Sequence, residues 1–157
     1  MKKVLLILAC GIATQLSYAQ ATPKWADKAK KAVFSIVTYD KDNKIKNTGN
    51  GFYINENGTA LSDYTLFEGA ERAVIINADS KELPVLRILG ANSMYDIVKF
   101  NTEADKKTIA LKSASQPASV GETVYLLPYS TQKAATCQTG TVTKVDTIGD
   151  KAYYYTL

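Results

Sequence analysis

The sequence predicts an all-β protein, a barrel or a sandwich, preceded by one short helix. Six segments suited to β-strands lie between residues 32 and 101, and clusters of Asp, Asn, Gly and Ser separate them at regular spacing. The composition is 46% hydrophobic and 22% charged, which is ordinary for a globular protein. A length of 157 residues suits one domain, or two small half-domains that share a core.

Residues 1–19 have the organisation of a secretory signal peptide. Lys2 and Lys3 form a positive start, residues 4–16 are apolar, and small residues occupy positions 17 and 19 before a cleavage point. The apolar run is shorter than the roughly 20 residues that a membrane-spanning helix needs. We therefore expect an exported protein, periplasmic or extracellular, with no membrane span.

Cys10 offers an alternative reading of the leader, because residues 7–10 resemble a lipoprotein cleavage box. Only residues 4–9 would then remain as the apolar segment, which is shorter than a signal peptide needs. The lipoprotein reading is therefore disfavoured. Without the leader, Cys137 is the single cysteine, so no intrachain disulfide is expected.

The charge of the chain argues against nucleic acid as a partner. Removal of Lys2 and Lys3 with the leader leaves 17 basic against 15 acidic residues, a net charge of +2. Binding to the phosphate backbone needs a concentrated basic surface, which this balance does not supply.

The elements after the leader can be placed by their patterns. An amphipathic stretch at 23–31 predicts a helix within 20–31. A tight type I′ turn at Asn57-Gly58 is predicted to join two strands of a hairpin. The other predicted strands of this region are 32–39, 73–78, 83–89 and 96–101.

The polar turn at 40–44 superficially resembles a calcium-binding loop, because Asp40 and Asp42 have the right spacing. Lys44 stands where a third oxygen ligand belongs, and Ile45 stands where the loop needs glycine. We therefore expect a solvated hairpin tip and no metal site.

A polar connector at 102–121 precedes a second β region at 122–157, with strands predicted at 122–129, 137–145 and 152–157. The last of these reaches Leu157 without a turn or a charged tail. We expect a strand that is cut partway, in a chain that is apparently truncated.

Several short motifs in a fixed order resemble the trypsin-like serine proteases, specifically their HtrA/Deg branch. They are Gly-Asn-Gly-Phe at 49–52, Glu-Gly-Ala at 68–70, Asp-Ile-Val at 96–98, Val-Gly-Glu-Thr-Val at 120–124 leading to Pro128, and Thr-Gly-Thr-Val at 139–142. The resemblance covers about residues 32–143. It implies a complete first trypsin-like β-barrel at 32–101 and a partial second barrel at 122–157.

The same resemblance implies that the catalytic triad is vestigial. The place of the general-base histidine falls on Thr65, or on Tyr64 if the register slips by one, and Asp96 matches the orienting aspartate. The chain contains no histidine, and the loop that carries the serine in that family would lie beyond Leu157. A hydroxyl cannot replace an imidazole that titrates near neutral pH. We expect no catalytic residue, no cofactor and no bound metal.

Each of these residues also has a purely structural interpretation. Asp96 can accept hydrogen bonds from backbone N–H groups in a turn, and this role is favoured when its histidine partner is missing. Thr65 can cap a helix at 66–69. Cys137 has no cationic neighbour and is expected to be inert. Alternation places Tyr153 and Tyr155 on one face of a strand and residue 154 on the other, which is ordinary strand packing.

The resulting hypothesis is an exported, non-catalytic pseudoprotease domain that binds protein or peptide, or forms the front part of a longer envelope protein. Self-association through an exposed strand edge is also expected, because a half-built barrel leaves backbone groups unpaired. Two alternatives stay open: a serine-type endopeptidase that uses another base, and a structural or adhesive β module.

Overall fold

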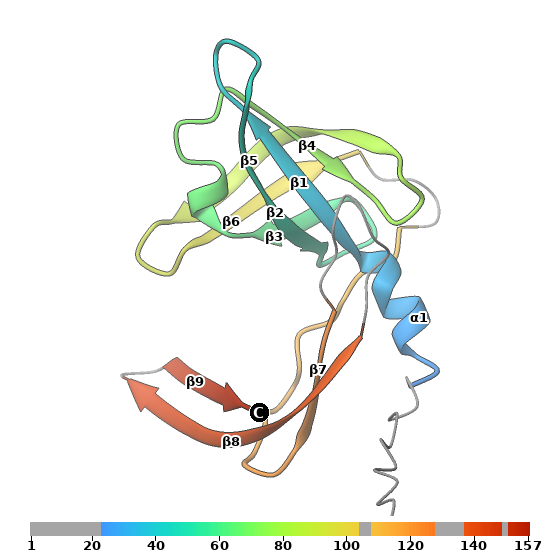
Figure 1. Ribbon diagram of the computed structural model, residues 1–157, viewed down its shortest axis with the longest axis vertical. Coiled ribbons are helices and arrows are strands. Elements are labelled where there is room, and N and C mark those ends of the chain that lie inside the picture. Colours follow the sequence, from blue (N-terminus) through green and yellow to red (C-terminus); the bar gives the residue numbers. More distant parts are fainter. Residues whose placement is uncertain (1–22, 104–107, 128–136, 149–150) are drawn as a thin grey trace, which may run out of the picture.

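The computed structural model describes residues 23–103, 108–127, 137–148 and 151–157. The predicted leader with Cys10 lies outside these residues, as do Pro128 and Tyr129 of the predicted strand 122–129. Within the described residues, nine strands form a closed six-stranded barrel and a separate three-stranded sheet. The predicted all-β, trypsin-like architecture, with a complete first barrel and a partial second one, is confirmed (Figure 1).

The N-terminal helix is shorter than predicted. α1 spans Ala26–Ala29 and continues as a single 3₁₀ turn, η1, over Lys30–Ala32. Ala26 is the buried residue of α1, whereas Trp25 is 50% exposed and meets the ring of Tyr125 edge-on at 5.0 Å. The helix therefore leads into the barrel and also touches the second sheet through an aromatic pair (Figure 1).

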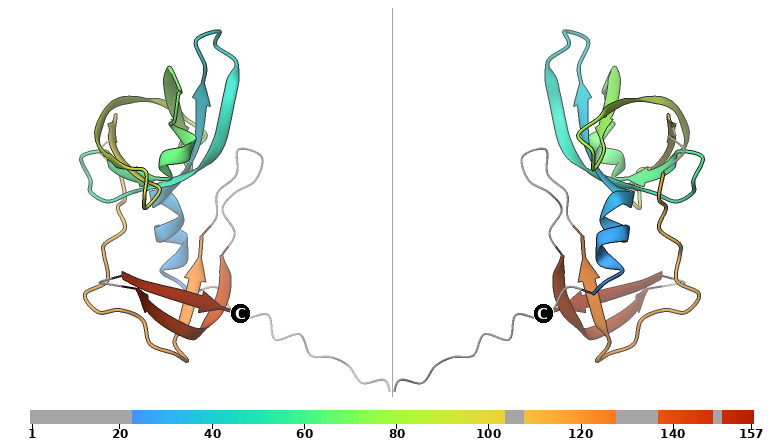
Figure 2. Two further views of the ribbon diagram at one scale, coloured as in Figure 1. Left: turned by 90° about the vertical axis from the view of Figure 1, so that its left-hand side faces the viewer. Right: turned by 90° about the vertical axis from the view of Figure 1, so that its right-hand side faces the viewer.

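Six antiparallel strands close the barrel in the order β1-β2-β3-β6-β5-β4. β5 pairs with β4 only near its start and with β6 over the rest of its length, so it curls from one neighbour to the other. Figure 2 shows the closed ring of strands from the side. The strands are β1 Val33–Tyr39, β2 Ile45–Tyr53, β3 Thr59–Ser62, β4 Arg72–Ile76, β5 Glu82–Asn92 and β6 Ile97–Thr102.

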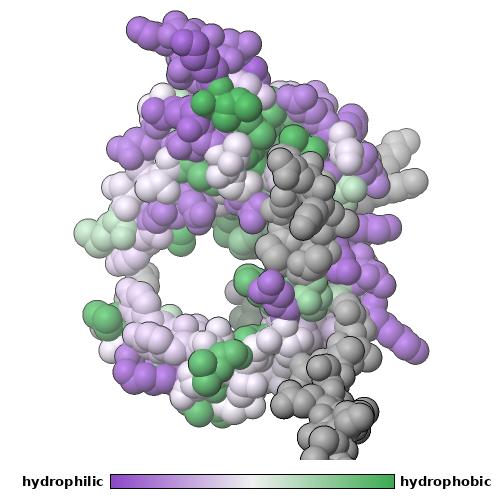
Figure 3. All heavy atoms as spheres, viewed as in Figure 1, coloured by the Kyte–Doolittle hydropathy of each residue, from purple (hydrophilic) through white to green (hydrophobic). Residues whose placement is uncertain are grey.

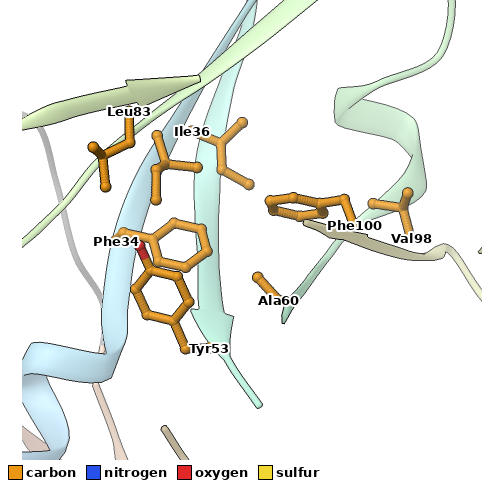
Figure 4. Close-up of a cluster of buried hydrophobic side chains, with 8 residues drawn as sticks. Phe34, Ile36, Tyr53, Ala60, Leu83, Val98 and Phe100 are labelled. Carbon is orange, nitrogen blue, oxygen red and sulfur yellow. The ribbon is translucent and has the colours of Figure 1, made fainter. Parts of the chain in front are cut away.

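The barrel encloses the hydrophobic core. Its rings meet edge to face, with Phe34 at 4.8 Å from Tyr53 and 6.3 Å from Phe100 between ring centroids. Figure 4 shows these side chains converging from strands far apart in the sequence. The cluster consists of Phe34, Ile36, Tyr53, Ala60, Ile75, Leu83, Val98 and Phe100, none of them more than 4% exposed.

Two of the tight connections in the barrel differ in how well they were predicted. At the tip between β1 and β2, the carboxylate of Asp40 accepts the N–H groups of Asp42 and Lys44, both at 2.9 Å, which confirms the hairpin turn. Between β2 and β3 the predicted type I′ turn is wrong, because only Gly58 has a positive φ. The side chain of Asn55 instead accepts the Thr59 N–H at 3.0 Å and closes a longer loop.

The second sheet is an open one. β8, Gln138–Ile148, lies in the middle between β7, Thr123–Leu126, and β9, Lys151–Thr156. The predicted alternation of tyrosines on β9 leaves all three exposed, by 43% to 50%. Val142 is the only buried hydrophobic residue of this sheet among the described residues.

Candidate functional site

The segment that carries Thr65 is a short 3₁₀ helix, η2, formed by Tyr64–Leu66. Asp63 precedes it with extended backbone and occupies the N-cap position, without a capping side-chain hydrogen bond. Thr65 therefore lies inside the helical turn. The predicted role of Thr65 as cap of a helix at 66–69 is wrong, because the helix begins before it and ends at Leu66.

Side chains from two strands of the barrel hold η2 in place. Asn47 of β2 donates from its amide nitrogen to the carbonyl of Leu66 at 3.2 Å. Phe67, directly after η2, packs on Phe100 of β6 with 5.2 Å between ring centroids. A Cβ atom at Gly49 would collide with the Leu66 side chain, so the first glycine of the Gly-Asn-Gly-Phe motif allows η2 to lie close to β2.

Asp96 stands just before β6 and reaches across to η2. Its two carboxylate oxygens accept two different bonds from Thr65: the backbone N–H at 2.7 Å and the hydroxyl at 3.0 Å. The backbone N–H of Tyr64 donates to the Asp96 carbonyl at 3.2 Å. Asp96 thus accepts backbone N–H groups of a turn, as predicted. Its own φ of +50° places it in the left-handed region, which aspartate tolerates better than most residues.

The structure therefore brings together the two positions that the sequence resemblance connected. Thr65 is exposed and Asp96 is half-buried, and the hydroxyl of Thr65 occupies the hydrogen-bonding place beside the carboxylate. Tyr64 instead packs its partly buried ring against the barrel core. A threonine hydroxyl donates to a carboxylate well, but it offers no group that accepts a proton near pH 7.

A cleft of about 590 Å³ lies beside this pair, between the barrel and the second sheet. Asp63 and Ile97, which line it, are close neighbours in sequence of Thr65 and Asp96. The space-filling view shows an open passage between the two parts of the molecule (Figure 3). Most of the lining is hydrophobic: Val33, Phe52, Leu61, Ile97, Leu111, Tyr125, Leu126 and Leu127.

Ser62 is the serine that lines this cleft, and its surroundings are those of a structural residue. It is 8% exposed and its hydroxyl donates to the main-chain carbonyl of Asn50 at 2.7 Å. A nucleophilic serine needs a base that accepts the proton of its hydroxyl. The bond that the structure gives Ser62 holds β3 against β2 and does not activate oxygen.

Among the described residues, no three acidic or cysteine side chains come together as metal ligands. The same residues include no helix of the length and hydrophobicity that a bilayer crossing requires. Cys137 lies just before β8 and is partly buried.

Comparison with solved structures finds serine proteases with a similar fold. No family model matches the sequence, and no curated protein matches it. A serine endoprotease from Yersinia pestis superimposes with a TM-score of 0.65 at 16% identity, over 76% of this chain and 43% of its own. The HtrA-type protease AlgW, solved with a tripeptide, gives 0.68 at 15% identity, over 81% of this chain and 42% of its own.

The chain has the trypsin-like fold of the HtrA-type serine proteases. It spans less than half the length of either of these two proteins. At this level of identity the likeness concerns the fold. Within the fold, Thr65 and Asp96 lie together beside the cleft, and Asn47, which sequence reasoning missed, helps to fix η2. A lone asparagine in a strand gave no signal of this role.

Proposed function

We propose that this chain is an exported, non-catalytic domain of trypsin-like fold that binds extended peptide segments in the cleft between its barrel and its second sheet. The observation that carries the proposal is the Thr65–Asp96 pair. A hydroxyl, bonded to the carboxylate at 3.0 Å, stands where the resemblance would place an imidazole. The serine and its base act as a unit, so loss of the base alone removes most of the rate of such an enzyme.

The cleft supports binding because its size and lining suit a peptide. Its volume of about 590 Å³ falls in the range of ordinary ligand pockets, and its lining is mainly hydrophobic. Among the described residues of the lining, Asp63 is the only charged one. We therefore expect segments with hydrophobic side chains, without acidic residues near Asp63, to bind best.

A titration with fluorescein-labelled hydrophobic peptides, read by fluorescence anisotropy, tests binding. Phe52 lines the cleft from β2, so Phe52→Glu places a charge in the lining and should weaken binding at least tenfold. Ile45 lies on the same strand, is 64% exposed and does not line the cleft, so Ile45→Glu is the matched control and should bind as the parent does. Equal affinities for both variants, or no binding by the parent, would contradict the proposal.

Absence of turnover is tested separately. We expect no labelling by a fluorophosphonate probe and no digestion of casein by the purified full chain. Labelling of a serine, or cleavage that one point substitution such as Ser62→Ala abolishes, would establish a hydrolase instead. Binding and turnover are read independently, so either half of the proposal can fail alone.

Self-association through a strand edge is a second proposal, and it has a specific observation in its favour. Within the described residues the second sheet is open, with β7 and β9 at its edges, and exposed edges pair with other strands. Analytical ultracentrifugation of the full chain over a hundredfold range of concentration tests it. A constant monomer mass would contradict it.

A further inference from the structure

A pocket of about 320 Å³ lies at one end of the barrel. Its lining comes from η1 before β1, the end of β2, the turn after β4, the start of β5 and residues 108–109 after β6. Because neighbouring strands of the barrel are antiparallel, all of these points lie at the same end, which is the end beside α1 (Figure 1). The mouths of β-barrels are common places for ligand sites.

This pocket is separate from the cleft between the barrel and the second sheet. The two have no described lining residue in common. Thr65 and Asp96 lie at the opposite end of the barrel, because they follow the end of β3 and precede the start of β6. A ligand in the pocket would therefore serve a function beyond the proposed binding of peptides.

The inner lining of the pocket is the apolar core of the barrel. Tyr53 and Leu83 belong to the core cluster and are 4% and 3% exposed. Ile109 adds an apolar side chain from the connector. The backbone N–H of Leu111 donates to the carbonyl of Tyr53 at 2.9 Å, which ties the connector to the end of β2. A ligand that fills this pocket therefore needs an apolar part that covers the core.

Two opposite charges stand at the entrance of the pocket. Lys31 and Asp79 both line it, and both side chains are exposed. In the part of the chain that the structure describes, neither forms an ion pair with the other or with any third residue. An ammonium group and a carboxylate that border one space without meeting can each pair with the opposite charge of a ligand.

The backbone that carries these charges is held in place. The side-chain oxygen of Asn77 accepts the N–H of Asp79 at 3.0 Å and the N–H of Lys81 at 2.9 Å, which fixes the turn between β4 and β5. Lys31 belongs to η1, whose next residue, Ala32, is fully buried at the start of the barrel. Binding between two fixed supports loses little backbone entropy.

We propose that this pocket binds a small zwitterion with an apolar side chain, of the class of the free α-amino acids. Lys31 pairs with the carboxylate of the ligand and Asp79 with its ammonium group. The apolar side chain of the ligand covers Tyr53, Leu83 and Ile109. The volume has room for about ten water molecules at roughly 30 Å³ each, which is enough for leucine or phenylalanine.

Ligands with one charge or none suit the entrance less well. A simple anion would meet the carboxylate of Asp79, and a simple cation would meet the ammonium of Lys31, and like charges repel. A neutral apolar molecule would leave both charges without a partner. A long peptide exceeds the volume. A zwitterion alone among these ligands satisfies both charges and the apolar lining together.

Three forms of one ligand test which charges are used. Leucine is compared with leucinamide, which lacks the carboxylate, and with N-acetyl-leucine, which lacks the ammonium group. Each is titrated into the isotope-labelled full chain, and the amide chemical shifts of residues 77–79 and 109 are followed by NMR. Because exposed ion pairs contribute modestly, we expect each modified form to bind about threefold to fivefold more weakly than leucine. Equal affinities of the three forms, or no shifts with leucine, would overturn the proposal.

The same three ligands assign each charge to its residue. Lys31→Met should bind leucine and leucinamide equally well and still discriminate against N-acetyl-leucine. Asp79→Asn should show the reverse preference. Lys28 is exposed and does not line the pocket, so the matched control Lys28→Met should keep both preferences. If both preferences survive in Lys31→Met and in Asp79→Asn, these charges do not hold the ligand and the proposal fails.

A pair of alanine variants tests the place of binding. Ala78 lines the pocket and is exposed, so Ala78→Phe fills part of the space and should weaken leucine binding at least tenfold. Ala114 is exposed in the connector and does not line the pocket, so Ala114→Phe should bind leucine as the parent does. Unchanged binding by Ala78→Phe would place leucine elsewhere and overturn the assignment. Tighter binding of leucyl-leucine than of leucine would overturn the choice of free amino acids in favour of short peptides.

The failure of this inference can be told from the failure of the proposed peptide binding. Phe52 lines the cleft but not this pocket, so Phe52→Glu should weaken peptide binding and leave leucine binding unchanged. Ala78→Phe should do the opposite. A loss of leucine binding in Phe52→Glu would contradict two separate sites.

Discussion

The closed barrel and the open three-stranded sheet consist of similar strands, yet only one of them has a core. Eight hydrophobic residues of the barrel are at most 4% exposed, whereas Val142 is the only buried hydrophobic residue that the structure describes in the second sheet. Pairing of β1 with β4 closes the ring, so the side chains that point into the barrel from one strand are covered by those of the others. Within the described residues, the large hydrophobic cluster therefore lies inside the closed barrel, and the strands of the second sheet contribute little to a core.

The largest difference between the barrel and the second sheet should appear in the hydrogen-exchange rates of their amides. Opening of a protein segment costs from nearly nothing up to the full free energy of unfolding, according to how much it buries. We expect the amides of β1 and β6 to exchange about a thousandfold more slowly than those of β7 and β8 in the free chain. Mass spectrometry of peptic fragments measures this. Equal protection of the two regions would show that they unfold as one unit.

A core truncation tests the barrel side of the comparison. Phe100 is fully buried and touches the rings of Phe34 and Phe67, so Phe100→Ala should lower the free energy of unfolding by about 3–5 kcal/mol. Ile148 at the end of β8 is 67% exposed, so Ile148→Ala should change the free energy of unfolding by less than about 0.5 kcal/mol. Urea denaturation of both variants provides the measurement. A comparable loss for Ile148→Ala would reveal packing on the second sheet.

The sequence predicted what depends on local pattern and missed what depends on three-dimensional contact. Alternating residues and turn residues gave the six strands of the barrel, and the order of short motifs gave the fold. The turn at 57–58 was predicted wrongly, because the Asn55 side chain takes over the bonds that a type I′ turn would have made. The contact of Thr65 with Asp96 followed from the family resemblance, since 31 residues separate the two.

The cleft between the barrel and the second sheet had no signal in the sequence. The cleft depends on how the barrel and the second sheet are placed relative to each other. The local sequence pattern of the strands and of the connector does not determine this placement. Asn47 illustrates the same limit on a smaller scale. Its amide holds the carbonyl of Leu66, 19 residues away, which a strand pattern does not predict.

Gly51 and Gly90 differ in how much space surrounds them, which allows close packing along a strand to be tested by substitution. A Cβ on Gly51 would lie 2.6 Å from Phe34 Cε2 and 2.9 Å from the Leu61 carbonyl oxygen, so Gly51→Ala should cost about 1–3 kcal/mol. A Cβ atom on Gly90 of β5 would meet nothing within 4 Å, and Gly90 has no positive φ. Gly90→Ala should therefore be neutral or stabilising by up to about 1 kcal/mol. Thermal unfolding of the pair measures both, and a stable Gly51→Ala variant would contradict close packing there.

The smallest expected effect concerns the Thr65–Asp96 pair. Thr65→Val keeps the shape of the side chain but removes the hydroxyl that donates to Asp96 at 3.0 Å. Thr65 is exposed, so the loss should lie near the lower end of the usual range for one hydrogen bond, about 0.5–1 kcal/mol. Urea denaturation at neutral pH measures it.

A double-mutant cycle with Asp96→Asn separates the bond between the two side chains from their other roles. Asparagine tolerates the φ of +50° at position 96, so the backbone there is kept. Asparagine has one acceptor oxygen instead of two, so it cannot accept the N–H and the hydroxyl of Thr65 on separate oxygens. We expect Thr65→Val to cost about 0.5 kcal/mol less in the Asp96→Asn background. Strict additivity would mean that the carboxylate acts on the η2 backbone alone, and that the hydroxyl at the place of the imidazole has no structural role.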